Sequence, residues 1–162
     1  MPAHLYSLSS IWNFAHPRQK VWDVMADPTM SWPLWWPGCS LAAPLEHHSD
    51  VHSSADEQIL TTTAALKFRA SYGYTLMVLY HPTRVNSPRE VTFDARGDLV
   101  GQGRAVLSSI DEQCTRVEIE WNVRPTSRWM QLLSPLAAPA FKHAHAVLMA
   151  KGETGLRNYL GR

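Results

Sequence analysis

Apolar and polar residues alternate along much of the chain, and this period of two predicts β-strands. The alternation is strictest in residues 90–96 and 116–124, where every second residue is apolar and those between are polar or charged. Residues 5–14, 60–68 and 72–80 follow the same period less regularly. Such strands have one face for the core and one for solvent. We therefore expect an antiparallel sheet with one apolar face and one charged face.

Helical spacing replaces the alternation after the first predicted strand. Pro17 suits the first turn of a helix, which we expect to continue through Met25 and to end before Pro28. The segment 32–38 predicts a second short helix, with a glycine at its end. The polar stretch 46–56 that follows is expected to be a loop.

The chain from Thr126 onward predicts a long terminal helix, kinked or split at Pro135 and Pro139. Beyond these prolines, one apolar stripe contains Phe141, His145, Leu148, Met149, Gly152, Leu156 and Tyr159. The order is thus one strand, two short helices, several strands and a long helix. That order indicates an α+β fold, which we expect to form one domain over residues 1–162.

Composition and charge exclude several classes of protein. Hydrophobic residues make up 45% of the chain and charged residues 18%, which excludes a disordered chain. The 15 Lys and Arg residues nearly balance the 14 Asp and Glu residues, so net charge points to no nucleic-acid partner. Apolar runs are too short for a membrane span, and the N-terminus does not resemble a signal peptide. We expect a cytoplasmic protein in which Cys39 and Cys114 are not bonded to each other.

Four segments resemble the START-like, or SRPBCC, superfamily, and within it the bacterial polyketide cyclase/dehydrase-like branch. They are residues 21–28, 35–38 and 97–103, and the chain end from Trp121 to Leu156. The resemblance implies a helix-grip fold, in which a curved antiparallel sheet wraps around the C-terminal helix and leaves a cavity between them. Glycines within 97–103 either open space in that interior or mark a bulge that curves the sheet.

Three observations together predict the residues of a ligand-binding cavity. They are the strand parity, meaning which alternate residues of a strand share its apolar face, the apolar stripe of the terminal helix, and the resemblance. Arg89 is included because it shares the parity of Val91 and Phe93. The expected lining residues are Phe68, Tyr72, Tyr74, Tyr80, Arg89, Phe93, Trp121, Phe141, His145 and Met149. A few polar groups in a mostly apolar cavity are typical of a small-molecule site. We expect binding or transport of a hydrophobic or aromatic molecule, such as a lipid, an isoprenoid or a polyketide.

Two other functions stay open at this stage. The resemblance implies an aromatase/cyclase-type enzyme, in which a tyrosine or His145 would move a proton and Arg89 would stabilise an enolate. A chaperone-activating or stress-related protein would instead use the outer face of the sheet. Catalytic cavities usually hold paired titratable groups, whereas the acidic residues here fall on the outer strand faces and in loops. The sequence therefore favours binding over catalysis.

Other chemistry is less consistent with the sequence. His47, His48, Asp50 and His52 could bind a metal, but they lie in a polar segment with no rigid element to hold them. The G-x-G of residues 101–103 lacks the third glycine and the following helix of a dinucleotide site. We expect no metal and no cofactor.

Overall fold

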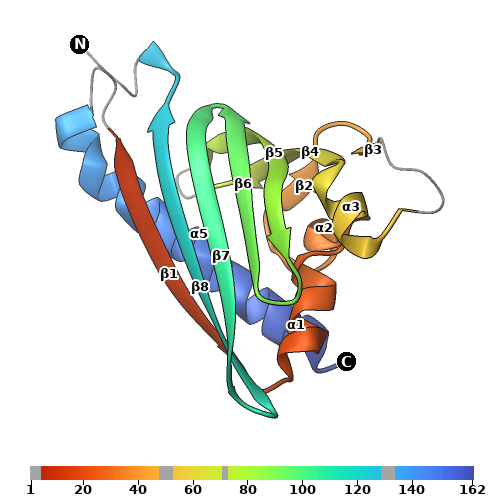
Figure 1. Cartoon of the computed structure of the whole chain (residues 1–162). Helices are drawn as coiled ribbons and strands as arrows, with labels where there is room; N and C mark the ends of the chain where they lie inside the picture. Colours follow the sequence, from red (N-terminus) through yellow and green to blue (C-terminus); the bar gives the residue numbers. More distant parts are fainter. Residues whose placement is uncertain (1–4, 48–52, 71–72, 129–133) are drawn as a thin grey trace.

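The strands form a curved antiparallel sheet, and the long C-terminal helix α5 (Ser134–Leu160) lies along one side of it (Figure 1). The computed structural model describes residues 5–47, 53–70, 73–128 and 134–162. The strands are β1 (Tyr6–Phe14), β2 (Cys39–Leu41), β3 (Glu46–His47), β4 (Thr62–Arg69), β5 (Thr75–Asn86), β6 (Glu90–Gly97), β7 (Leu99–Asp111) and β8 (Cys114–Pro125). They follow the order β1-β8-β7-β6-β5-β4-β2, and β3 pairs with β4. This confirms the predicted α+β, helix-grip architecture.

The two short helices expected after the first strand are present as α1 (Arg18–Met25) and α2 (Trp32–Trp35). A further helix, α3 (Ala55–Leu60), occupies part of the segment that we expected to be a loop. A capping box starts it: the Ser54 hydroxyl accepts from the Glu57 N–H at 3.2 Å, and the Glu57 carboxylate accepts from the Ser54 N–H at 2.9 Å. The following strand, β4, therefore begins at Thr62 and not at Leu60.

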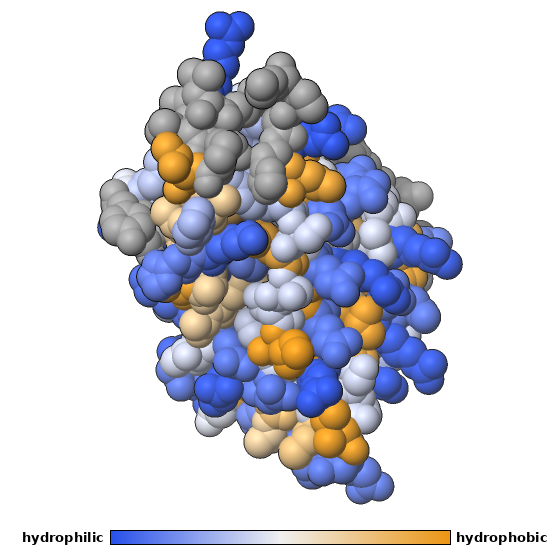
Figure 2. All heavy atoms as spheres, turned by 90° about the vertical axis from the view of Figure 1, so that its left-hand side faces the viewer, coloured by the Kyte–Doolittle hydropathy of each residue, from blue (hydrophilic) through white to orange (hydrophobic). Residues whose placement is uncertain are grey.

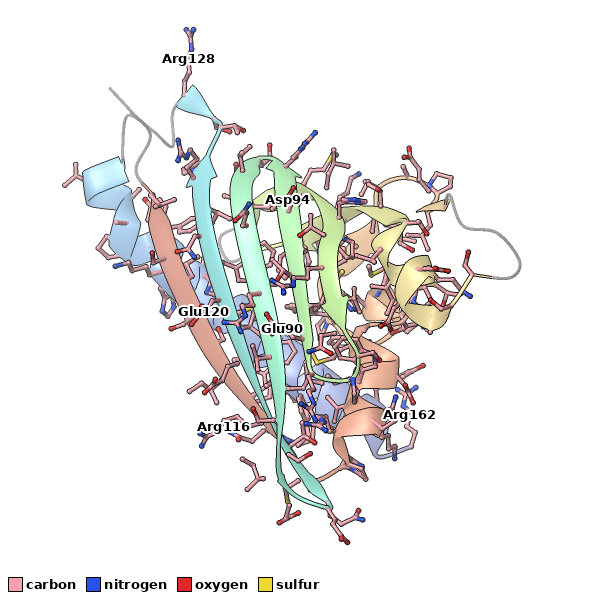
Figure 3. All side chains as sticks on the ribbon, in the orientation of Figure 1. Glu90, Asp94, Arg116, Glu120, Arg128 and Arg162 are labelled. Carbon is pink, nitrogen blue, oxygen red and sulfur yellow. The ribbon has the colours of Figure 1, made fainter. Side chains whose placement is uncertain are left out.

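The two faces of the sheet differ as the alternation predicts. Residues facing α5 are mostly buried, while the opposite face carries charged side chains, among them Glu90, Asp94 and Glu120 (Figure 3). Arg104 on β7 donates to the Glu90 carboxylate on β6 at 2.6 Å, and this hydrogen bond lowers the pKa of Glu90. Because the pair is exposed to solvent, it adds little to stability.

A cluster of tryptophans fills the sheet interior beside α2. Trp35 and Trp36 stack with their ring centroids 5.5 Å apart, and Trp12 of β1 meets Trp36 edge-on at 5.4 Å. The Trp36 indole N–H donates to the Leu148 carbonyl at 3.0 Å, which ties α2 to α5. The rings pack closely against one another, and only a small space of about 40 Å³ remains beside them.

One of our two interpretations of the glycines in residues 97–103 was that they open space in the interior. Gly103 and Gly97 do not do so. Gly103 lies opposite Phe93, whose ring occupies the place that a side chain on residue 103 would take. Gly97 has a φ of +103°, a conformation that favours glycine, at the end of β6. These glycines permit close packing and a change of chain direction.

Cys39 is buried, Cys114 is half-buried, and both thiols are free, as predicted. Burial raises the pKa of Cys39 to about 12, so this thiol stays protonated and unreactive at neutral pH. Among the described helices, none has the length and apolar character needed to cross a membrane.

Candidate functional site

A cavity of about 390 Å³ lies between the inner face of the sheet and the N-terminal half of α5. Its size falls within the range of small-molecule sites, roughly 300–1,000 Å³. The described residues that line it are Tyr6, Leu8, Trp36, Phe68, Ala70, Tyr74, Leu76, Val78, Leu99, Trp121, Val123, Pro125, Ala137, Ala140, Phe141, Ala144, His145, Leu148 and Met149. The walls are therefore almost wholly apolar.

The size of the residues on α5 explains where the cavity lies. Ala137, Ala140 and Ala144 recur at helical spacing on the cavity-facing side, and their methyl groups leave space before the sheet. Further along the helix, the larger side chains of Met149 and Leu156 are buried in the core. The same helix thus borders an open interior in its first half and closes a solid core in its second half.

Six of the predicted lining residues border the cavity: Phe68, Tyr74, Trp121, Phe141, His145 and Met149. Tyr80 and Phe93 have the predicted inward orientation but lie in the solid core, where their ring centroids are 4.9 Å apart. They border only a separate space of about 40 Å³ beside the tryptophan cluster. Tyr72 lies outside the described residues.

Arg89 is exposed and does not line the cavity, so its expected inward orientation is wrong. The strand parity that we used does not apply to it, because β6 begins only at Glu90. Arg89 belongs to the preceding turn, where its backbone N–H donates to the Asn86 carbonyl at 2.7 Å. Its guanidinium group therefore cannot stabilise an enolate inside this cavity.

Several lining residues were missed by the sequence analysis. The alternation in β1 places Tyr6 and Leu8 on its inner face, but it could not show which part of β1 faces open space. Trp36 belongs to a helix-ending segment, whose side-chain direction the pattern does not give. The alanines of α5 carried a usable signal, since small residues on the side of a helix that faces a sheet leave space between the two.

Two buried polar atoms belong to residues of this otherwise apolar lining. The indole Nε1 of Trp121 and the imidazole Nε2 of His145 have no hydrogen-bond partner among the described residues. Burial lowers the pKa of His145 to about 4, so its ring is neutral near pH 7. The described lining residues include no Asp, Glu, Lys or Arg. The cavity is therefore uncharged at neutral pH.

The buried position of His145 predicts a specific pH dependence of stability. The folded protein holds this ring neutral down to about pH 4, whereas an unfolded chain protonates it near its ordinary pKa of 6.5. Because the unfolded state then binds more protons, stability falls as pH drops from about 6.5 to 4. At pH 5 the wild type should have lost about 2 kcal/mol relative to a His145→Leu variant. Urea unfolding of both proteins from pH 7.5 to 4.5 measures this difference, and parallel curves would contradict it.

A second groove of about 450 Å³, with both polar and apolar walls, lies outside the cavity between β1 and α5, and His145 borders both spaces. Lys142 and Glu153 lie along this groove. Near its end the Glu153 carboxylate accepts from the Asn13 N–H at 2.8 Å, so α5 protects part of the open edge of β1. Figure 2 views the molecule from the β1 side, where apolar residues appear as small patches among polar ones.

No family model matches the sequence, and no curated protein matches it. Solved structures do match the fold. Zhui aromatase/cyclase from Streptomyces sp. R1128 is similar with a TM-score of 0.71 and 12% identity, over 98% of this chain and 95% of that one. A START superfamily protein from Mycobacterium smegmatis has a TM-score of 0.68 and 13% identity, with 96% and 97% covered. Ara h 8.0201 has a TM-score of 0.62 and 13% identity, with 97% and 98% covered. The chain has the SRPBCC/START-like helix-grip fold.

Proposed function

On the basis of this fold and its cavity, we propose that the protein binds a hydrophobic or aromatic small molecule between the sheet and α5. The observation that carries the proposal is the cavity of about 390 Å³ with almost wholly apolar walls. Space of this kind costs packing energy while it is empty, and a ligand with an apolar body would recover that energy. Helix-grip proteins typically bind hydrophobic ligands, which agrees with the proposal.

Titration with the neutral fluorescent probe N-phenyl-1-naphthylamine tests this function. We expect saturable binding of one probe per chain, with a blue-shifted emission because the probe leaves water for an apolar site. Flat polycyclic compounds should displace it. Fluorescence that rises without saturation, or a stoichiometry well above one, would contradict a single enclosed site. Native mass spectrometry of freshly purified protein would also detect a ligand that co-purifies.

An aromatase/cyclase activity has less support from the side chains. The similarity to Zhui aromatase/cyclase concerns the fold at 12% identity. Of the residues that such a reaction was expected to use, Arg89 is exposed, while Tyr74 and His145 border the cavity without a carboxylate among the described lining residues. A proton-transfer pair with divergent environments is therefore not assembled from these residues. Binding is the function that the cavity supports best.

A further inference from the structure

We propose that the protein pairs with a second copy of itself through the open edge of β1, so that the two sheets join into one. β1 is the last strand of the sheet beyond β8, and no described strand lies on its other side (Figure 1). At the opposite end of the sheet, β2 has only three residues, and such short edge strands resist pairing. β1 has nine residues and is therefore the long open edge of the described sheet.

The contact between β1 and α5 shows which backbone groups face this edge. The Asn13 N–H donates to the Glu153 carboxylate at 2.8 Å, and the Asn13 C=O accepts from the Arg157 guanidinium at 3.2 Å, so both groups point away from β8. In an antiparallel strand, the N–H and C=O of one residue point to the same side, and successive residues alternate. The pairing of β1 with β8 runs along the whole strand without a bulge. The N–H and C=O groups of the odd-numbered residues of β1 therefore point to the open edge.

α5 closes this edge only near the end of β1. Before that point, the backbone N–H and C=O groups of Ser7, Ser9 and Ile11 have no hydrogen-bond partner among the described residues. The groove of about 450 Å³ between β1 and α5 runs beside them. Its wall on α5 includes Ala146 and Ala150, whose small side chains leave room beside the edge. An extended segment can therefore lie along β1 in this groove and add a strand to the sheet.

The sequence of β1 favours a second β1 as that segment. Its nine residues, YSLSSIWNF, include no Lys, Arg, Asp, Glu or Pro, and these are residues that commonly keep an open edge from pairing. When two copies run antiparallel with Ser9 opposite Ser9 of the other copy, Ser7 lies opposite Ile11, and each of these pairs exchanges backbone hydrogen bonds. Neither like charges nor a missing N–H opposes this register. Pairing also covers part of Ile11, whose side chain is 56% exposed.

The same features limit the assembly to two copies. Glu153 and Arg157 already occupy the N–H and C=O of Asn13, so the added ladder cannot extend past Ile11. A two-fold pair uses the long edge of both chains, and the short β2 offers no second one. The arrangement is therefore a closed dimer and does not lead to a fibre.

Sedimentation equilibrium and hydrogen exchange of the wild-type protein test the proposal. Between about 5 µM and about 1 mM we expect a reversible monomer–dimer equilibrium, because an interface of one strand pair is small. As the dimer forms, exchange should slow at the amides of Ser7, Ser9 and Ile11, which point to the other copy. The amides of Leu8 and Ser10 point to β8 by the same alternation and should change little. A protein that stays monomeric over this range, or a dimer without slower exchange at the three edge amides, would overturn the proposal.

Variants at Ser9 assign the dimer to this edge. Ser9→Pro removes an N–H that β8 does not use, and proline is tolerated on such an edge. Ser9→Lys keeps the N–H but places two positive charges opposite each other at the centre of the pair. Each should weaken dimerisation at least about tenfold while the monomer stays folded.

Gln102→Lys is the matched control for the added charge, because Gln102 is exposed on β7, inside the sheet and away from both edges. Its dimerisation constant should stay within about twofold of the wild type. An equal loss in Gln102→Lys and Ser9→Lys, or a dimer that both Ser9 variants leave unchanged, would show that the copies do not meet through the edge of β1.

Discussion

Ala144→Phe is expected to abolish probe binding without unfolding the protein. Ala144 lies on the cavity-facing side of α5, beside Phe141 and His145. A phenyl ring at this position would project into the space of about 390 Å³ that a ligand would need. We expect the affinity for N-phenyl-1-naphthylamine to fall by about 100-fold or more, equivalent to about 2.7 kcal/mol. The melting temperature should stay the same or rise, because filling an apolar cavity commonly stabilises a protein by about 0.5–2 kcal/mol.

Ala146→Phe provides the matched control for this experiment. Ala146 lies two residues further along α5, but it is exposed and borders the outer groove instead of the cavity. The same change in side-chain size should therefore leave probe affinity unchanged. If both variants bind the probe as the wild type does, the site lies elsewhere. If Ala144→Phe shows no cooperative thermal transition, the variant is not folded and its loss of binding is not informative. A smaller change, such as Ala140→Leu, must then weaken probe binding in a protein that still folds.

The sheet and the main helices could be predicted because each depends on a local pattern. In β6 and β8 the alternation of apolar and charged residues already assigns each side chain to one face. α1 was predicted from Pro17 and Pro28 at its ends. The missed helix α3 also had a local signal, the pair Ser54 and Glu57, but its short polar sequence resembles a loop when only hydrophobic spacing is considered.

The cavity was harder to predict, because it depends on how far α5 and the sheet stand apart at each point. The alternation along the strands correctly predicted that Trp121 and Phe93 face inward. Of the two, only Trp121 lines the cavity between the sheet and α5. The difference arises from residues distant in sequence: α2 fills the interior next to Tyr80, with Trp32 and Tyr80 ring centroids 5.0 Å apart. The predicted orientation of Arg89 was wrong for another reason. We extended the alternation of β6 to residue 89, which belongs to the turn before the strand.

The solid end of the interior depends on two glycines of α5 that allow the helix to approach α2. A side-chain carbon on Gly155 would overlap the backbone carbonyl oxygen of Trp35, and one on Gly152 would lie 2.6 Å from the Trp36 ring. Both neighbours are held in place: Trp36 donates to the Leu148 carbonyl, and Trp35 donates to the Ser31 hydroxyl at 3.1 Å. A backbone carbonyl cannot turn aside as a flexible side chain can, so Gly155 is the more demanding position.

Gly155→Val is therefore expected to destabilise the fold by about 3 kcal/mol or more, because overpacking commonly costs about 1–3 kcal/mol and the neighbour here is backbone that cannot turn aside. The gain from replacing glycine in a helix, below about 1 kcal/mol, is too small to compensate. Thr154→Val introduces the same side chain one residue earlier, where the position is exposed, and should change stability by less than about 0.5 kcal/mol. Urea unfolding followed by tryptophan fluorescence measures both changes, since the rings beside α2 report on this region. Near-wild-type stability of Gly155→Val would mean that α5 can move away from α2, and that close contact at the glycines is not what holds the solid end of the interior together.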